Sequence, residues 1–471
     1  MVYFFKAQNS CHFAANMLQF TDRIEILPRY EKVWISERES DRACAGIGVR
    51  EEIDTIVWIS ERERENRMDK LKVGEFTDLF YPTLNGVTKV VDKLSNALGE
   101  TNCAEVRVSA TRGKKGRLPE PPEDRAYELV TCRGFTVPIQ KDTTSLPGLD
   151  RKYRKEIASK PLDILHCHTM GGQFKMAKKL KKKWDVPIVA TLHAQADLDL
   201  KKFLKAQWLV NKIMHGMMKS YNSCDEIWSL NTGMRDYAVK WGADPSKIRV
   251  VGNACDYRYP ENPEKICEEF DREHGIGADE TVFLFVGRLL DYKNIFFTLE
   301  ALKILKERGL KFRMYYVGEG PDGGRLKRAV AEYGMEDCVS LEGKVIDRKK
   351  LAAYYLRAKL FLFPSLFDAF SIVQLEAAAH KTPTLFLKGS VTSSGFVDGQ
   401  NMFESGHSPE AFADRVEEIL KNSELYERVS EGCYREMYRS WEDYARNVAD
   451  AYADAIARYR ARAEVRKGTL K

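Results

Sequence analysis

Two basic residues in the second half of the sequence are spaced to grip a diphosphate. Arg288 and Lys293 lie in the segment 286–294, which follows an apolar strand-like run at 281–286 and leads into a predicted helix. Two fixed cations beside a helix N-terminus suit a diphosphate leaving group, because its negative charge grows in the transition state. The alternative is a pair of solvated surface charges, which the position directly after a buried strand disfavours.

Two acids of the same half, Asp368 and Glu376, are separated by seven residues. Asp368 falls in a loop after a predicted strand, and Glu376 falls one turn inside the next helix. The N–H groups of Phe370, Ser371 and Ile372 would be free donors of that helix start, able to hold phosphate oxygens. Asp368 can accept from sugar hydroxyls, and Glu376 from both ribose hydroxyls. The plainer alternative is an N-cap aspartate followed by a helix-surface glutamate.

Short apolar strands that alternate with helices position these segments. The pattern predicts an α/β fold: two Rossmann-like, doubly wound parallel-sheet domains that face a cleft and are joined near 255–275. Ligands in such sheets sit at the carboxyl ends of the strands. Predicted strands are 72–76, 163–166, 188–192, 227–230, 248–251, 281–286, 312–317, 339–341, 360–363 and 384–387, and predicted helices are 88–98, 172–183, 200–221, 232–241, 295–308, from 324, 348–357, from 370, and 441–462.

An ordered set of short motifs resembles glycosyltransferase family 4, the retaining GT-B enzymes. In the second half the set comprises 287–288 with 293–294, 317–321, 341–345, 363–365, the acid pair 368–376, and 376–379. In the first half, 76–78 with Pro82 and 85–87 is similar to the opening loop of that family, and 163–169 and 191–193 are similar to its acceptor-side signatures. Each motif is weak by itself, but their order over residues 70–460 is specific.

The resemblance implies roles for the matching residues. Arg288 and Lys293 would contact the donor diphosphate, Asp368 the transferred sugar and Glu376 the ribose. Gly86 would let its loop approach the donor phosphates, which a side chain would block. The implied catalytic residues are Asp368, His168, Arg288 and Lys293; the implied donor contacts are Gly86, Gly287, Arg288, Lys293, Gly343, Val345, Phe370, Ser371, Ile372 and Glu376, with Gly343 and Val345 near the base; the implied acceptor-side residues are Asn85, His168 and His193.

The sequence departs from the family pattern at two places. Asp368 stands where most members carry glutamate, which leaves the identity of the sugar open. His380-Lys381 replaces a pair that usually contains glycine. We expect His380 to cap the C-terminus of its helix, where a cation is favourable.

His166 and His168 lie on one side of a predicted strand, as two ligands of a metal site would. No third ligand stands at a usual spacing, so no metal is predicted. No Ser-His-Asp triad is expected either, because the sequence has no nucleophile elbow. No cofactor is expected to be required, because the nucleotide-diphosphate sugar is a substrate, and a divalent cation is not predicted.

A lysine-rich segment, 175–183, is predicted to form an amphipathic helix, and 200–220 adds further lysines among apolar residues. An anionic membrane surface would attract such lysines by roughly 1 kcal/mol each and would suit a lipid acceptor. The alternative is an ordinary solvated helix face. We therefore expect a cytoplasmic protein, with peripheral binding at the inner membrane face as the functional alternative.

Length and composition agree with two domains. The chain has 471 residues, 44% hydrophobic and 31% charged, and a net charge of +6, which does not indicate a nucleic-acid protein. Ten scattered cysteines without a Cys-x-x-Cys pair indicate reduced thiols. No apolar run is long enough for a membrane span, and no signal peptide is recognisable.

The first 67 residues differ from the rest. The heptapeptide at 33–39 recurs at 57–63, and we expect an N-terminal extension outside the native core, with Met68 as the native start; a small accessory domain is the alternative. The predicted limits are 1–67 for the extension, 68–262 for the acceptor-binding domain, 263–440 for the nucleotide-sugar domain and 441–471 for a C-terminal helix that crosses back.

The function expected from these residues is retaining transfer of a sugar, with UDP-glucose as the first donor to test, to a lipid or glycan hydroxyl in glycolipid or surface-polysaccharide synthesis. A sugar-nucleotide epimerase of the same fold is the alternative in another reaction class. A binding protein without catalysis is disfavoured, because Arg288, Lys293 and Glu376 are all present.

Overall fold

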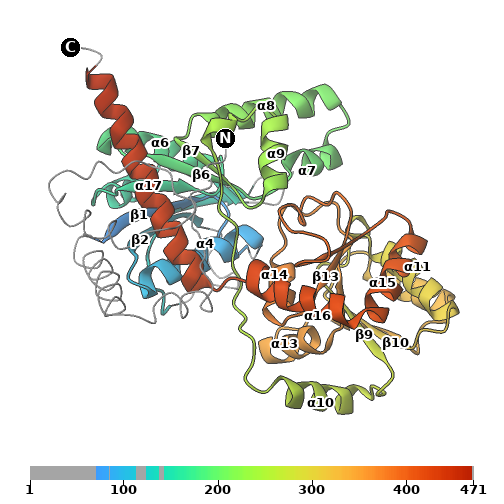
Figure 1. Ribbon diagram of the computed structural model, residues 1–471. Coiled ribbons are helices and arrows are strands. Elements are labelled where there is room, and N and C mark those ends of the chain that lie inside the picture. Colours follow the sequence, from blue (N-terminus) through green and yellow to red (C-terminus); the bar gives the residue numbers. More distant parts are fainter. Residues whose placement is uncertain (1–69, 84, 113–122, 137–142, 469–471) are drawn as a thin grey trace, which may run out of the picture. The chain divides into compact units, whose positions relative to one another are not determined.

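The computed structural model describes residues 70–83, 85–112, 123–136 and 143–468. Two sheets form within these residues, one in each half of the chain, with helices packed against them (Figure 1). The predicted α/β class with two doubly wound sheets is confirmed. The repeat at 33–39 and 57–63 lies outside the described residues.

The first sheet runs in the order β4-β3-β2-β1-β5-β6-β7-β8; the β3–β4 pair is antiparallel and the other pairs are parallel. All residues of β5 and β6 are buried, as is expected when helices cover both faces of a parallel sheet. The strands are β1 (Leu71–Thr77), β2 (Ala104–Arg112), β3 (Glu128–Thr136), β4 (Thr143–Ser145), β5 (Ile164–Cys167), β6 (Ile188–Leu192), β7 (Glu226–Ser229) and β8 (Ile248–Val250).

Helices cover both faces of this sheet. Successive strand residues point to opposite sides, so Val189 joins one core and its neighbours Ile188 and Ala190 join the other. Helices α4 and α17 supply the first core, and α6 and α8 the second. The helices of this half are α4 (Gly86–Glu100), α5 (Arg151–Ile157), α6 (Gly172–Trp184), α7 (Ala196–Phe203), α8 (Gln207–Asn222) and α9 (Thr232–Lys240).

The second sheet is parallel throughout, in the order β11-β10-β9-β12-β13-β14. Its central strand β9 is buried at five of six positions, as its unbroken apolar run predicts. The strands are β9 (Thr281–Val286), β10 (Phe312–Val317), β11 (Val339–Gly343), β12 (Leu360–Leu362), β13 (Thr384–Leu387) and β14 (Phe403–Ser405); the helices are α10 (Pro263–His274), α11 (Ile295–Glu307), α12 (Gly323–Glu332), α13 (Arg348–Arg357), α14 (Ile372–Ala379), α15 (Pro409–Lys421) and α16 (Ser423–Gly432).

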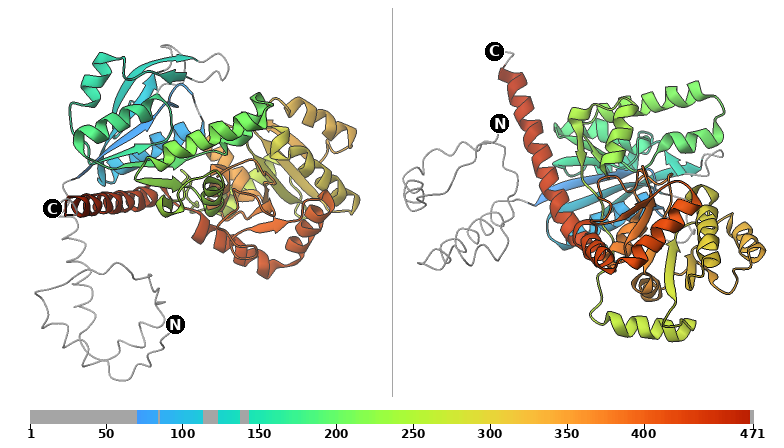
Figure 2. Two further views of the ribbon diagram at one scale, coloured as in Figure 1. Left: turned by 90° about the horizontal axis from the view of Figure 1, so that it is seen from above. Right: turned by 45° about the vertical axis from the view of Figure 1, so that its right-hand side comes forward.

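Helix α17 (Trp441–Gly468) returns from the second half to the first, as predicted. Tyr444, Val448 and Tyr452 share a core with Val91 and Leu94 of α4. The views in Figures 1 and 2 agree that α17 runs beside the first sheet. The last long segment of the chain therefore completes the first core.

The structure corrects two sequence predictions. The single helix at 200–221 is wrong: α7 and α8 are separate, and Leu204 between them is extended (φ −114°, ψ 111°). The joining segment 255–275 is not a plain linker, because it contains α10, which starts with Pro263 and ends at a left-handed Gly275. Elements that the sequence reasoning missed are β2, β3, β4, α5, β14, α15 and α16.

In the described part of the chain, no helix combines the length and apolar character needed to cross a membrane. The described cysteines are all free thiols, as expected.

Candidate functional site

Lys293 and Asp368 form a direct ion pair at the carboxyl end of the second sheet. The Lys293 Nζ lies 2.9 Å from both carboxylate oxygens of Asp368, and Ser365 Oγ donates to Asp368 Oδ2 at 2.6 Å. The side chains are only 13% and 20% exposed. The pair arises because β9 and β12, which precede the two loops, are adjacent strands.

Asn294 and two glycines hold the cationic loop in place. Asn294 adopts the left-handed region (φ 60°) and donates from Nδ2 to the carbonyl of Pro364 at 2.7 Å, which ties the Lys293 loop to the Asp368 loop. Gly318 has φ 138°, and a Cβ there would overlap the carbonyl oxygen of Gly287. The close approach of these two backbones requires glycine.

Arg288 is exposed and has no hydrogen bond or ion pair with any described residue. It lies close enough to Tyr292 to oppose the rise that burial produces in the pKa of that phenol. The ring of Tyr292 packs at 4.3 Å on Phe367, the residue before Asp368. Arg288 is therefore a cation without a partner among the described residues, near Tyr292 on the loop that carries Lys293.

Glu376 stands on α14, where Tyr355 OH donates to its Oε2 at 2.9 Å. Burial raises the pKa of Glu376, and the charge of Lys89 on α4 opposes the rise. One carboxylate oxygen is thus held by the protein, while the other is without a hydrogen bond from the described residues.

The backbone donors before α14 are not all free. The N–H of Ser371 donates to Thr392 Oγ1 at 3.0 Å, so the expectation that it is free for a phosphate is wrong in this structure. The N–H groups of Phe370 and Ile372 are the remaining candidates. Thr392 is in turn held by Gln374 Oε1 at 2.7 Å.

The other implied donor contacts lie at element ends. Gly86 is the exposed first residue of α4, and a Cβ there would meet no atom within 4 Å. Asn85 caps this helix by accepting from Thr88 N at 2.9 Å. Gly343 ends β11 with φ 66°, and Val345 follows it, partly buried. The packing of the described residues therefore does not explain the glycine at position 86.

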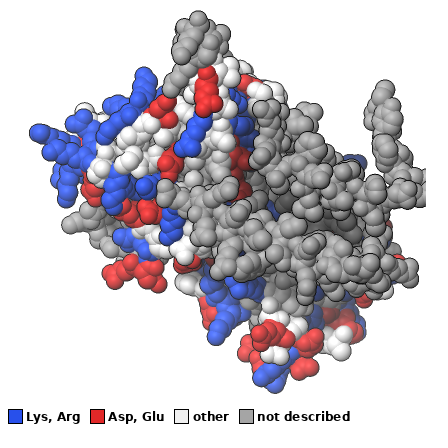
Figure 3. Space-filling view, turned by 60° about the vertical axis from the view of Figure 1, so that its left-hand side comes forward, with Lys and Arg blue, Asp and Glu red and all other residues white. Residues whose placement is uncertain are grey.

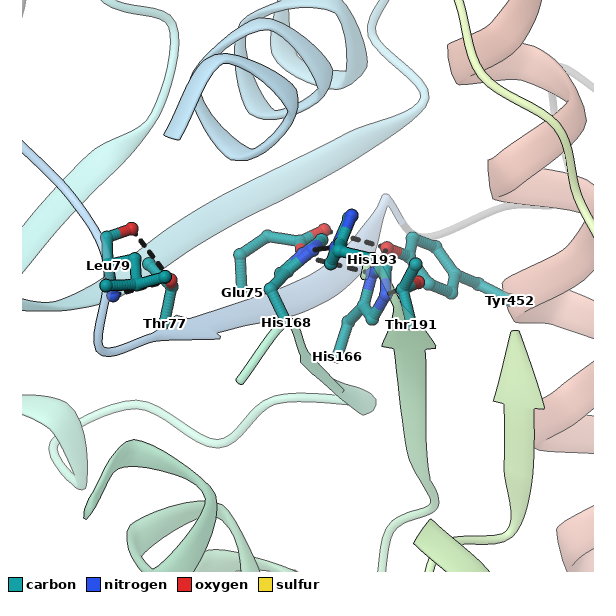
Figure 4. A network of polar contacts seen from close by, with 8 residues as sticks. All are labelled: Glu75, Thr77, Leu79, His166, His168, Thr191, His193 and Tyr452. Carbon is teal, nitrogen blue, oxygen red and sulfur yellow. Dashed lines mark hydrogen bonds and ion pairs between the residues drawn. The ribbon is translucent and has the colours of Figure 1, made fainter. Parts of the chain in front are cut away.

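The first half contains a buried polar network centred on Glu75 of β1 (Figure 4). Its Oε2 lies 2.6 Å from His168 Nε2 and 3.1 Å from His166 Nδ1, and its Oε1 accepts from Tyr452 OH at 2.7 Å. His168 Nδ1 lies 2.9 Å from His193 Nε2. Although burial alone would raise the pKa of Glu75, the charge of His166 and hydrogen bonds from both imidazoles bring it below its ordinary value.

This network changes the expectation for His168. Both of its ring nitrogens are occupied, by Glu75 and by His193, and its side chain is fully buried. His168 therefore does not present a free nitrogen to a substrate. His193 is the only partly exposed residue among the described side chains of this network.

Glu75 is the third candidate metal ligand, beside His166 and His168, that the sequence did not reveal. The ligand atoms of these three residues lie within 4.8 Å of one another. The remaining nitrogen of His166 lies 2.7 Å from Thr191 Oγ1, so every nitrogen of these two rings already has a protein partner. The hydrogen-bonded network therefore satisfies itself without an ion.

Two amides of the first half hold the loop that carries Asp368. Gln195 donates to the carbonyl of Phe367 at 2.9 Å, and Asn231 donates to the carbonyl of Ala369 at 2.9 Å. A cavity of about 290 Å³ lies beside this contact. It is lined from both halves of the chain, by Leu230, Asn231, Phe370, Ser394 and Arg439 among others. Residues near Asp368 are thus positioned by both sheets.

His380 caps α14, but not as a cation. Its Nδ1 lies 2.7 Å from the carbonyl of Glu376, and burial lowers its pKa to about 4. The neutral ring donates one N–H to that carbonyl and stacks on Tyr355 at 5.6 Å. The expected favourable charge at the helix end is therefore replaced by an uncharged hydrogen bond.

The sequence reasoning missed Glu75, Gln195 and Asn231. A lone carboxylate between Val73 and Phe76 of a predicted strand is a signal for Glu75, since buried acids need partners. Gln195 and Asn231 lie in the loops after β6 and β7, where the strand-end rule places ligand-side residues.

Comparison with known proteins agrees with this architecture. Residues 267–436 match the family described as Glycosyl transferases group 1, and residues 84–259 match Glycosyltransferase Family 4. The D-inositol 3-phosphate glycosyltransferase of Thermobispora bispora is 27% identical over 364 residues, which cover 72% of this chain and 83% of that protein. The D-inositol 3-phosphate glycosyltransferase 2 of Catenulispora acidiphila is 26% identical over 405 residues, covering 80% and 91%.

Solved structures share the fold. HepE of Anabaena in complex with UDP has a TM-score of 0.64 at 13% identity, covering 82% of this chain and 100% of that one. Sucrose-phosphate synthase of Thermosynechococcus elongatus has a TM-score of 0.63 at 17% identity, with coverage of 82% and 100%.

Two doubly wound sheets with a cation–acid site at the strand ends, together with these matches, define a glycosyltransferase of the GT-B fold. The chain is such an enzyme, and the matches of its two halves support its placement in glycosyltransferase family 4.

Proposed function

We propose that the protein transfers a sugar, with retention of anomeric configuration, from a nucleotide-diphosphate sugar to a hydroxyl group. The observation that supports this most is the Lys293–Asp368 pair, with Arg288, which has no partner among the described residues, on the same loop as Lys293. A diphosphate offers Arg288 the anionic partner that it lacks and competes with Asp368 for Lys293, which releases Asp368 for sugar hydroxyls.

The chemistry needs no nucleophile from the protein. Arg288 and Lys293 would stabilise the charge that builds on the leaving diphosphate, and the N–H groups of Phe370 and Ile372 would add neutral donors. The departing phosphate oxygen would take the proton from the acceptor hydroxyl on the same face. The free oxygen of Glu376 would bind the ribose.

UDP-glucose is the first donor to test, and lipid or glycan hydroxyls are the first acceptors. The names of the curated relatives add D-inositol 3-phosphate as a further acceptor. The test is a screen of nucleotide sugars by thermal shift, followed by mass spectrometry of products formed with membrane extract and with defined acceptors. Transfer with an α-linked product from an α-linked donor is expected. Turnover of donor alone into an isomeric nucleotide sugar would indicate an epimerase instead.

We further propose that an anionic lipid surface is a docking partner for α6. This helix buries Phe174, Ala177 and Leu180 and exposes five lysines, namely Lys175, Lys178, Lys179, Lys182 and Lys183. Trp208, at the start of α8, is a second exposed group, with 68% of its side chain accessible, and is an apolar residue that could enter a membrane interface. On the part of the face in Figure 3 that is not grey, basic side chains form several groups with acidic ones among them.

Vesicle co-sedimentation tests this docking. Binding to vesicles that contain anionic lipid is expected at low salt and should weaken with salt. Replacement of Lys175 and Lys178 by glutamate should weaken it strongly, and replacement of Lys179 and Lys182 as well should abolish it. The charge reversal of Lys327 and Arg328 on α12, which matches the double replacement in number, should leave binding unchanged. Lys181 is left unchanged, because it pairs with Asp225. Equal binding of the wild type and all of these variants would contradict the proposal.

A further inference from the structure

The network around Glu75 determines where its protons lie. An ionised carboxylate can only accept hydrogen bonds, so the short contact of 2.6 Å requires the proton on His168 Nε2. Burial, followed by the charge of His166, lowers the pKa of His168 to about 4, so the ring is neutral at pH 7. A neutral imidazole carries one N–H, and His168 Nδ1 is therefore an acceptor.

His193 also carries its proton on Nε2. Its Nε2 lies 2.9 Å from the bare Nδ1 of His168 and must supply the proton of that hydrogen bond. Burial also lowers the pKa of His193 below its ordinary value, so this ring too is neutral. His193 Nδ1 is then unprotonated and can accept a hydrogen bond, and no described residue makes a hydrogen bond to it.

His193 lies at the edge of the site. It follows β6, and Gln195, two residues further on, donates to the carbonyl of Phe367 next to Asp368. The ring is partly exposed, whereas Glu75 and His168 are buried. Figure 4 shows Glu75, His168 and His193 in succession, with Tyr452 reaching the carboxylate from α17.

We propose that Glu75 and His168 are positioning residues that hold His193 in its Nε2–H form, so that His193 Nδ1 accepts a hydrogen bond from a hydroxyl group of the sugar substrate. This inference rests on the proposed function, since a sugar hydroxyl is the donor that it requires. His193 is the residue that touches substrate, and Glu75 acts only through His168. The arrangement selects a hydroxyl donor and rejects a group that can only accept.

Glu75→Gln is the sharpest variant. The amide places an NH₂ group where the carboxylate accepted from His168, which can invert the order of donors along the chain to His193. Tyr452→Phe is the matched control, because it removes a hydrogen bond to the same carboxylate but leaves the His168–His193 contact in place.

Nitrogen-15 spectra of protein labelled at histidine test the proposal in the absence of substrate, with His193→Gln used to assign the signal. The expected wild-type spectrum has a protonated Nε2 and a bare Nδ1 at His193. A His193 that carries its proton on Nδ1 overturns the proposal, and this result does not depend on any donor sugar.

Kinetics supply the second readout. Glu75→Gln is expected to lower kcat by roughly 100-fold, with the KM for donor changed less than about threefold. Tyr452→Phe is expected to lower the melting temperature but leave kcat within about threefold and the His193 signal unchanged. Equal loss of kcat in both variants, or a Glu75→Gln protein with wild-type kcat, overturns the proposal. Absence of sugar transfer by the wild type would instead contradict the proposed function.

Discussion

The ammonium group of Lys293 lies 2.9 Å from each carboxylate oxygen of Asp368. This contact joins the loop after β9 to the loop after β12, and Asn294 joins the same loops through the carbonyl of Pro364. The cation and the acid therefore compensate each other in the free protein. In the proposed reaction, a diphosphate would take the place of Asp368 at Lys293, and a sugar hydroxyl would take the place of Lys293 at Asp368.

Arg288→Ala should lower kcat by a factor of roughly 100–1,000, which corresponds to about 3–4 kcal/mol of lost transition-state stabilisation. The melting temperature should stay close to that of the wild type, because Arg288 is exposed and has no partner among the described residues. Initial-rate kinetics with the best donor provide the measurement. Lys327→Ala, which removes an exposed cation from α12, is the control; equal losses in both variants would contradict a role for Arg288 at the diphosphate.

Gly86→Ala should separate ligand binding from stability. A Cβ at this position meets no atom within 4 Å and lies at the first position of α4, so stability should be unchanged or higher by up to about 1 kcal/mol. If donor phosphates approach this loop, the methyl group should raise the KM for donor by about tenfold or more. Unfolding in urea and donor titration measure the two effects. A KM equal to that of the wild type would place the phosphates elsewhere.

Glu376→Gln should weaken recognition of the ribose. The free carboxylate oxygen is expected to accept a ribose hydroxyl, and an amide can replace only part of this interaction. Affinity for the nucleoside diphosphate should fall by about tenfold in calorimetry, and discrimination against the 2′-deoxy and 3′-deoxy nucleotides should shrink. Tyr355→Phe, which removes the hydrogen bond to the other oxygen, should preserve that discrimination. A variant that still rejects both deoxy nucleotides fully would contradict this role.

Stability should fall as the pH is lowered from 6.5. Burial lowers the pKa values of His168 and His380 from 6.5 to about 4, so between these values the unfolded chain binds protons that the folded chain does not. From pH 6.5 to pH 5 the free energy of unfolding should therefore decrease, by on the order of 2 kcal/mol for each histidine. Carboxyl groups whose pKa values are lowered change the free energy of unfolding at pH values below this range. Burial raises the pKa of Glu376, so this group makes the free energy of unfolding increase as the pH falls.

Urea unfolding at pH 7 and pH 5 measures this loss of stability. His380→Gln should reduce the difference between the two pH values, since glutamine can donate to the carbonyl of Glu376 without titrating. An unfolding free energy that rises towards pH 5 in the wild type would contradict neutral burial of these histidines.

The sequence by itself determined the two doubly wound sheets and placed Lys293 and Asp368 in loops after predicted strands. Unbroken apolar runs such as Thr281–Val286 mark strands buried on both faces. Such runs are local signals, because they depend on residues within one strand–loop–helix unit. The contact of Lys293 with Asp368, by contrast, arises from the adjacency of β9 and β12 in the folded sheet.

Only the tertiary structure decided what the histidines do. Glu75 meets His168 because β1 lies beside β5, and it meets Tyr452, 377 residues away, because α17 returns to the first sheet. Sequence spacing gave no sign of these contacts, nor that His168 is enclosed while His193 is partly exposed. Such contacts depend on strand order and on the path of the last helix, which are set by packing of the whole chain and not by any local pattern.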